Sequence, residues 1–336
     1  MGIITEIVVN TPTQLVDISR ICESVTLNLE LEGNAGQMEL SYLSKHRVDI
    51  SEGDTVSLKV NGKKMFYGWV FKKEIDASNS VKLKVYDIKR YLAYKDVDVT
   101  GQETIDQFFT RICTVMNIKH KVVNTSDYII PIKIHDGETY NNMLQYAIDQ
   151  TLIGTNGQQR FCVRANGDTL ELVNCINQLT DILIGDKRYL TNYHFSSDIE
   201  NTYTTFKVQR DVASEEQKKL SKTEQILLRT TLVSVNRENV DKWGDLQYYE
   251  KKDSKWTDTQ LAQYMNHVSQ VYSKKTKTLK LNCLGDTQCI PGNVILVDIA
   301  DLHSENVAKR KFVLITAATH NITHNLHTME LTVEVS

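Results

Sequence analysis

A chain of 336 residues is too long for one compact core and predicts two to four domains. Its 41% apolar and 24% charged content is ordinary for a globular protein, and a formal net charge of −3 gives no electrostatic reason to expect nucleic acid or an anionic membrane as a partner. No run of eighteen apolar residues occurs and no secretory signal is visible, so we expect no membrane span and no export.

Residues 1–95 predict a first β-barrel. Val25, Leu27 and further apolar residues alternate with polar ones, which is the pattern of a half-buried strand. A Gly-containing turn then precedes a strand at 55–60, the hairpin dipeptide Asn61-Gly62 and a strand at 64–71. Several short strands in fewer than a hundred residues favour a small barrel or sandwich.

Residues 96–178 change to a helical period. Apolar residues at helical spacing predict amphipathic helices over 103–116 and about 139–151. The second helix follows residues 136–139, which include candidate N-caps. A predicted hairpin at 159–173 completes a small α+β module.

The chain returns to β character in residues 179–212 and 276–336, which we assign to a second β-barrel. Between them, residues 213–275 are rich in charge and show almost no alternation, so we interpret them as a solvated insertion. One helix is expected inside it, because Thr257 and Gln260 form a possible capping box. The predicted fold class is therefore α+β, mainly β.

The second β region repeats the first. A Gly-polar turn followed by a strand-length apolar run occurs at 50–60 and again at 290–299. The apolar positions answer one another in the order Val56, Leu58, Val60 and Ile295, Val297, Ile299.

The next strands are also matched, 64–70 with 310–316. Leu83 follows Phe66 at the same interval at which Met329 follows Phe312. The shared order of turn, strand, strand, hairpin and strand predicts a duplicated unit.

With this layout, the chain resembles the baseplate hub proteins of contractile phage tails and R-type bacteriocins. That family includes the late control protein D group, the hub of PBSX-type prophages and the N-terminal part of the type VI spike protein. The residues that carry the resemblance are 50–54, 290–293, 313–315, the run from His320 to Val335, 137–139 before a helix, and 242–247.

The resemblance implies two tube-like β-barrels per chain and a homotrimer whose six barrels join a hexameric tail tube to a trimeric spike. Subunit contacts would come from barrel strands and from the insertion. Other baseplate proteins would be partners, and the particle would assemble in the bacterial cytoplasm. No catalytic residue, cofactor or metal is implied, and we expect none.

Three histidines form the best metal candidate, because nitrogen ligands at close spacing suit zinc. They are His320, His324 and His327. Asn321 stands where a helical zinc protease motif needs Glu, and the segment is typical of a turn between strands, so a structural role is expected.

Acid–base chemistry could be imagined for Asp286, Asp298 and His303, but nothing in the sequence places them together. A nucleophile elbow and a phosphate-binding P-loop are both missing from the sequence. Two other function classes stay open: a tail-associated peptidoglycan hydrolase and a carbohydrate-binding β module.

Aromatic residues fall into two groups. Those on predicted strands are expected in the core: Tyr42, Phe66, Tyr67, Trp69 and Tyr86. Those among the charges of the insertion are typical of partner contacts: Trp243, Tyr248, Tyr249 and Trp256.

The six cysteines are scattered without a CxxC pair, which predicts reduced and mostly buried thiols. They are Cys22, Cys113, Cys162, Cys175, Cys283 and Cys289.

Overall fold

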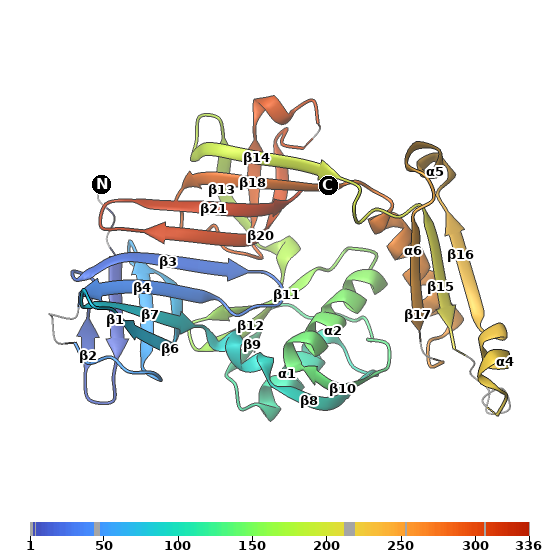
Figure 1. Cartoon of the computed structure of the whole chain (residues 1–336), viewed down its shortest axis with the longest axis horizontal. Coiled ribbons are helices and arrows are strands. Elements are labelled where there is room, and N and C mark those ends of the chain that lie inside the picture. The colour runs from blue at the N-terminus through green and yellow to red at the C-terminus, as the bar shows by residue number, and fades with distance from the viewer. Residues whose placement is uncertain are drawn as a thin grey trace.

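The computed structural model describes residues 3, 5–43, 48–211, 219–252, 254–305 and 307–335. The first part of the predicted insertion, residues 213–218, lies outside the described residues. Figure 1 shows two β units one above the other, an α+β module beside them, and a smaller sheet with its own helix at the far end of the molecule. None of the described helices combines the length and apolarity that a membrane span requires.

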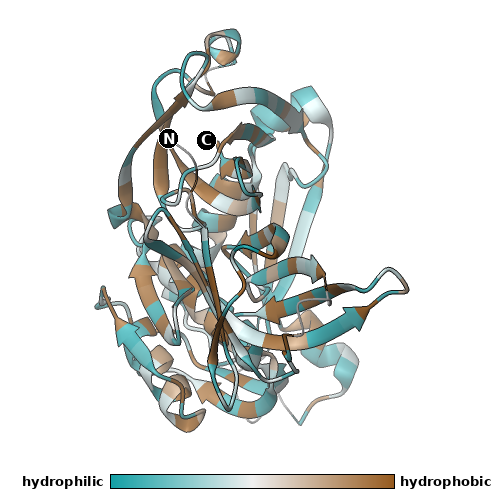
Figure 2. Ribbon diagram, turned by 90° about the vertical axis from the view of Figure 1, so that its left-hand side faces the viewer, coloured by the Kyte–Doolittle hydropathy of each residue, from teal (hydrophilic) through white to brown (hydrophobic). Residues whose placement is uncertain are grey.

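The first β unit is an antiparallel sheet folded around one apolar core. Its spatial order is β3-β4-β7-β6-β5-β1-β2. Apolar residues that face the core alternate with more polar ones, because successive side chains of a strand point to opposite faces. The alternation appears as brown and teal bands on the strands in Figure 2. The strands are β1 (Thr5–Asn10), β2 (Leu15–Asp17), β3 (Cys22–Glu30), β4 (Gln37–Leu43), β5 (Thr55–Val60), β6 (Lys63–Ile75) and β7 (Ser80–Tyr86).

The second β unit has the order β14-β18-β21-β20-β19-β13 around a separate core. Its strands are β13 (Leu179–Gly185), β14 (Leu190–Asp198), β18 (Thr276–Leu284), β19 (Val294–Asp298), β20 (Lys311–Ile322) and β21 (His327–Glu334). A short 3-10 turn, Ala300–Leu302, follows β19.

The predicted repeat is confirmed for five strands. The orders β3-β4-β7-β6-β5 and β14-β18-β21-β20-β19 are the same when each unit is read in chain order, and every neighbouring pair is antiparallel. The sixth strand differs, since β1 is antiparallel to β5 whereas β13 is parallel to β19.

The two Gly-polar turns are bonded in the same way. The N–H of Gly53 donates to the carbonyl of Val70 at 2.9 Å, and the N–H of Val70 donates to the carbonyl of Asp54 at 2.9 Å. The counterparts are Gly292, Ile315 and Asn293, with both distances 3.0 Å. Both glycines have positive φ, 94° and 89°, which the third position of a type II turn requires.

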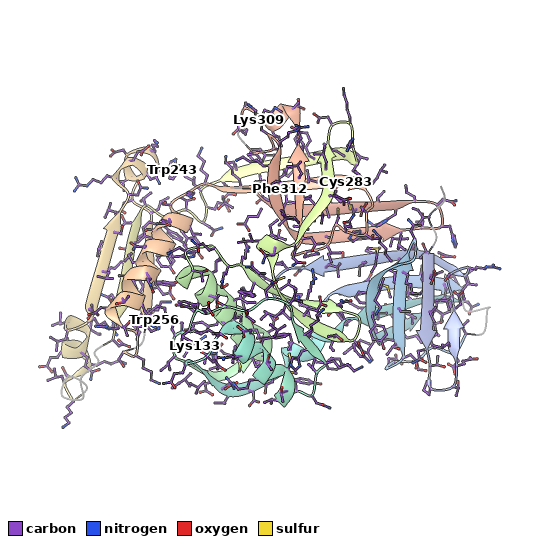
Figure 3. The ribbon with its side chains drawn as sticks, turned by 180° about the vertical axis from the view of Figure 1, so that it is seen from behind. Lys133, Trp243, Trp256, Cys283, Lys309 and Phe312 are labelled. Atoms are coloured by element: carbon purple, nitrogen blue, oxygen red, sulfur yellow. The ribbon has the colours of Figure 1, made fainter. Side chains whose placement is uncertain are left out.

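These bonds also correct the predicted alignment of the second strand by one residue. Because Val70 corresponds to Ile315, the counterpart of Phe66 is Lys311 and not Phe312. A slip of one residue moves a side chain to the other face of a sheet. Accordingly, Phe66 is 5% exposed and Phe312 is 63% exposed (Figure 3).

The two units share one continuous sheet, because the second half of β20 pairs antiparallel with β3. The prediction of closed barrels is wrong for this chain. The described ends of the first unit, β3 and β2, do not pair with each other, nor do β14 and β13 in the second. Each sheet wraps around its core through side-chain packing without closing into a ring of paired strands.

The α+β module contains a two-stranded ribbon, β10-β8, and a three-stranded sheet, β11-β12-β9. Both predicted helices and the hairpin are present, and Thr139 caps the second helix by accepting a hydrogen bond from the N–H of Asn142. The elements are the 3-10 turn Ile88–Ala93, β8 (Lys95–Thr100), α1 (Ile105–Val115), β9 (His120–Val122), β10 (Lys133–Thr139), α2 (Tyr140–Gly154), β11 (Phe161–Asn166), β12 (Thr169–Asn174) and the 3-10 turn Cys175–Asn177.

The small sheet at the far end has the order β16-β15-β17 and is covered by α6. The predicted capping box of Thr257 and Gln260 starts that helix. β15 was expected in the second β unit but pairs on both sides with strands of the insertion, so this sheet extends across the expected boundary at 213. Its elements are β15 (Thr205–Arg210), α4 (Lys222–Leu227), β16 (Thr230–Val235), α5 (Arg237–Trp243), β17 (Gln247–Lys252) and α6 (Asp258–Tyr272).

Candidate assembly interface

Two of the three candidate histidines form a buried pair inside the second β unit. His320 on β20 and His327 on β21 are 0% and 5% exposed, and His320 Nδ1 lies 3.0 Å from His327 Nε2. His320 Nε2 lies 3.0 Å from the carbonyl oxygen of Cys289. Burial lowers the pKa of His320 to about 3, with a further contribution from His327, so the pair is neutral and acts as a hydrogen-bonded link.

His324 lies in the exposed turn between β20 and β21 and does not join this pair. Only His324 therefore occupies the turn expected for all three residues. Within the described part of the chain, no three His, Cys, Asp or Glu residues are grouped so as to hold a metal ion.

Of the three residues considered for acid–base chemistry, Asp298 and His303 lie together and Asp286 has other partners. His303 Nε2 lies 2.9 Å from Asp298 Oδ1, and Arg310 Nε lies 3.4 Å from Asp298 Oδ2. Asp286 instead accepts from the N–H of Gln288 at 2.9 Å. Asp298 and His303 are thus brought together, which the sequence did not indicate, and they close the turn after β19.

The strand aromatics serve two packing surfaces. Tyr42 and Phe66 are buried in the first core, as predicted. Trp69 faces the other side of β6, packs against the core of the α+β module and lies edge-on to Tyr91 with ring centroids 5.5 Å apart. Aromatic side chains on the outer face of β6 therefore fix the module to the first unit.

Two of the four insertion aromatics, Tyr248 and Trp256, pack within their own module, which corrects their predicted role as partner contacts. Trp256 is 6% exposed and Tyr248 is partly buried against the same cluster under α6. Tyr249 is 50% exposed on the opposite face of the small sheet. Of this group, Tyr249 is the residue that best retains the exposure a partner contact needs.

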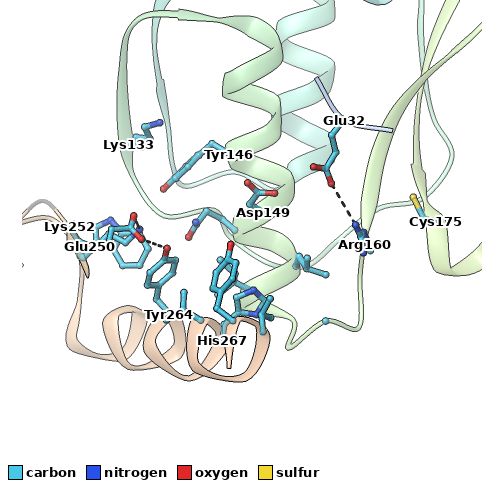
Figure 4. A pocket seen from close by; sticks show the side chains of 18 of the residues that line it. Glu32, Lys133, Tyr146, Asp149, Arg160, Cys175, Glu250, Lys252, Tyr264 and His267 are labelled. Carbon is cyan, nitrogen blue, oxygen red and sulfur yellow. Dashed lines mark hydrogen bonds and ion pairs between the residues drawn. The ribbon is translucent and has the colours of Figure 1, made fainter. Parts of the chain in front are cut away.

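A cleft of about 1140 Å³ lies between α2 and α6 (Figure 4). Burial raises the pKa of Asp149 to about 6. Burial alone would raise the pKa of Glu250 as well, but Lys252 and two tyrosine hydroxyls hold it below its ordinary value. These two hydroxyls, of Tyr248 and Tyr264, donate to Glu250, whose other oxygen lies 2.6 Å from Lys252 Nζ. Glu250 is thus occupied by internal partners that dock α6.

The large sheet has several strand edges that could form an assembly interface. Among the described residues, strand partners are lacking on one side of β2, β13, β14 and the end of β6 beyond Val70. β13 is the sixth strand of the second unit, where the two units differ, and β2 lies beyond β1, the sixth strand of the first unit. The remaining two edges, β14 and the end of β6, correspond to β3 and the end of β20, which pair with each other inside the chain.

The edge residues include exposed charge and exposed apolar surface. Lys72 and Glu74 form an ion pair of 2.6 Å with both side chains more than half exposed. Ile75, at the end of β6, is 59% exposed. No local sequence pattern marks these residues as an interface, because a strand edge depends on which distant strands pair.

The two-unit sheet with modules beside it is a fold that the chain shares with a solved prophage tail protein. The chain superposes on the 43 kDa tail protein of prophage MuSo2 from Shewanella oneidensis with a TM-score of 0.69, covering 98% of both chains at 11% identity. At that identity the likeness shows the fold.

The chain belongs to the YqbQ-like family, whose model matches residues 25–334. It is 25% identical to the uncharacterized protein YqbQ of Bacillus subtilis, covering 93% of this chain and 92% of that protein. It is also 25% identical to the phage-like element PBSX protein XkdQ of the same organism, covering 72% of each. The resemblance to hub-like tail proteins indicated by the sequence is confirmed.

Proposed function

We propose that this protein is a structural hub of a contractile tail or bacteriocin baseplate. Three copies would form a ring of six β units, joining a hexameric tail tube on one side to a trimeric spike on the other. The protein acts in the tail baseplate together with other baseplate proteins, and it catalyses no reaction.

The observation that carries this proposal is the duplication. Five strands of each unit share order, direction and turn bonding, although the sequences of the units have diverged. Two related units in each of three chains present six similar surfaces, which match a sixfold partner while the ring retains threefold symmetry. Similarity to a protein of the phage-like element PBSX and to a prophage tail protein supports a role in a phage tail.

The test is the mass of the purified protein in solution and its copy number in a particle. Light scattering should give three times the 38.4 kDa chain mass, and a particle reconstruction should contain three copies at the end of the tube. A monomer at the highest concentration reached, together with a copy number other than three, would refute the hub assignment. Zymography on cell walls should show no clearing, and clearing would favour the hydrolase alternative.

A further inference from the structure

The chain contains a template for how its β units join. β20 and β3 pair antiparallel over six residue pairs, from Ala317 opposite Glu30 to Ile322 opposite Val25. The N–H of Leu31 donates to the carbonyl of Thr316 at 2.8 Å, which extends the ladder. Thr319 Oγ1 donates to Asn28 Oδ1 at 2.9 Å, so side chains also contact across this junction.

β20 has a residue-by-residue counterpart in β6. Both strands carry a bulge at the same point, after Val70 in β6 and after Ile315 in β20. Beyond the bulge, Lys72 corresponds to Ala317, and Ile75 corresponds to His320.

β3 has its counterpart in β14. Each has a register shift near its start, between Cys22 and Ser24 and between Leu190 and Asn192. Past these shifts, Leu27 lies opposite Met38 in β4, and Phe195 lies opposite Leu279 in β18. The counterparts at the junction are therefore Leu27 with Phe195, Asn28 with Ser196 and Glu30 with Asp198.

The two counterpart edges are unused within the chain. Among the described residues, β14 pairs only with β18, and β6 beyond Val70 pairs only with β7. An unpaired row of N–H and carbonyl groups is a ready template for another strand. The chain thus pairs β20 with β3 internally, whereas the equivalent strands, the end of β6 and β14, each have an edge without a strand partner among the described residues.

We propose that β6 of one copy pairs antiparallel with β14 of the next copy, in the register of the internal β20–β3 junction. This inference rests on the proposed function and adds the residues of the contact. Lys72 of one copy then lies opposite Asp198 of the next copy. Glu74 and Ile75 lie opposite the next copy's Ser196 and Phe195. The contact joins unlike surfaces, so repetition closes a ring if the rotation allows.

The chemistry of the edges fits this register. The internal counterparts of Ile75 and Phe195, His320 and Leu27, are both fully buried. Pairing would accordingly cover Ile75, which is 59% exposed in the single chain, and Phe195, which is partly buried. It would also place the Lys72 ammonium against the Asp198 carboxylate, an attraction that favours this register over its neighbours.

A cysteine pair tests the register. Side chains approach most closely at positions that do not exchange backbone hydrogen bonds. Because Leu31 bonds to Thr316, the alternation along the ladder makes Asn28 and Thr319 such a pair in the template. The double variant Glu74→Cys/Ser196→Cys should therefore form a disulfide between copies under mild oxidation. The matched control is Glu74→Cys/Ser197→Cys, because residue 197 points to the opposite face of the sheet. The six native cysteines are all free and buried, so the parent protein should give no background.

Non-reducing gels and light scattering then separate the possible results. Covalent multimers from the in-register pair, with little from the control, support the junction, and a ladder ending at three chains supports the ring as well. Equal cross-linking of both variants overturns the register. A noncovalent trimer without cross-linking overturns the junction and leaves the hub proposal standing. A protein that stays monomeric at the highest concentration reached, with no cross-link, overturns both.

Discussion

The two β units share five strands and their register, yet they end differently. In the second unit, the end of β20 pairs with β3, and a histidine is buried there at His320. In the first unit, the end of β6 has no second partner among the described residues, and the equivalent Ile75 is exposed. Cores and turns are therefore preserved by the need to fold, whereas the strand ends reflect whether the partner strand comes from the same chain.

Equivalent core truncations should have the largest effect. Leu83→Ala in the first unit and Leu331→Ala in the second remove side chains that are 1% and 0% exposed, and each should cost about 2–5 kcal/mol of unfolding free energy. Because the sheet is continuous through β20 and β3, both variants should shift a single urea transition. A second transition in only one of the variants would show that the units unfold separately.

Acid should destabilise the second unit through His320. Its pKa in the folded protein is about 3, below the ordinary value of 6.5, so the unfolded chain binds the proton first. Stability from this group is present above pH about 6.5 and is lost as the pH falls toward 3, with a slope of up to about 1.4 kcal/mol per pH unit. Denaturation at stepped pH should show a flatter profile for His320→Gln and an unchanged one for the exposed His324→Gln.

The two turn glycines should respond unequally. Both have positive φ, so Gly53→Ala and Gly292→Ala each incur backbone strain of about 1–2 kcal/mol. A Cβ at Gly53 would meet nothing within 4 Å, whereas one at Gly292 would lie 2.9 Å from Cys162 Sγ. Urea midpoints should therefore fall further for Gly292→Ala. Equal losses would mean that the Cys162 side chain yields without cost.

The smallest effect is expected from charge at the open edge. Lys72 pairs with Glu74 at the surface, where ion pairs contribute about 0–1 kcal/mol, so Lys72→Glu should barely change the stability of one chain. Against Asp198 of the next copy it should weaken association by up to about fivefold, or about 1 kcal/mol. Adding Asp198→Lys should restore association in sedimentation measurements. Weakening without rescue would assign the effect to another contact.

Much of the fold was predictable because its signals are local. The apolar alternation of Val56, Leu58 and Val60 and the positive-φ glycine at 53 indicate a strand and a turn from neighbouring residues alone. The placement of Phe312 is wrong by one residue, because matching it to Phe66 rests on residue type, whereas the inward-facing positions of β20 are fixed by its pairing with β19. The sequence predicts a partner contact for Trp256, because no neighbouring residue indicates that α6 covers it.

The candidate interface was less predictable, since it depends on pairing between distant segments. Residues 25–30 pair with residues 317–322, although almost the whole sequence separates them. No pattern in either segment indicates that the other is its partner. The role of β15 was misassigned for the same reason, because its strand partners lie in the insertion.

The pairing of β3 with β20 also orders the events of biosynthesis. The first unit can assemble all of its core except Ile322 as soon as residues up to β7 have left the ribosome. The outer edge of β3 then stays unpaired while roughly 230 further residues are made, until 317–322 are available. A nascent edge exposed for that long invites capture by neighbouring chains. Slow synthesis anywhere between β7 and β20 lengthens that exposure, so it should lower the yield of native protein more than equally slow synthesis ahead of β3.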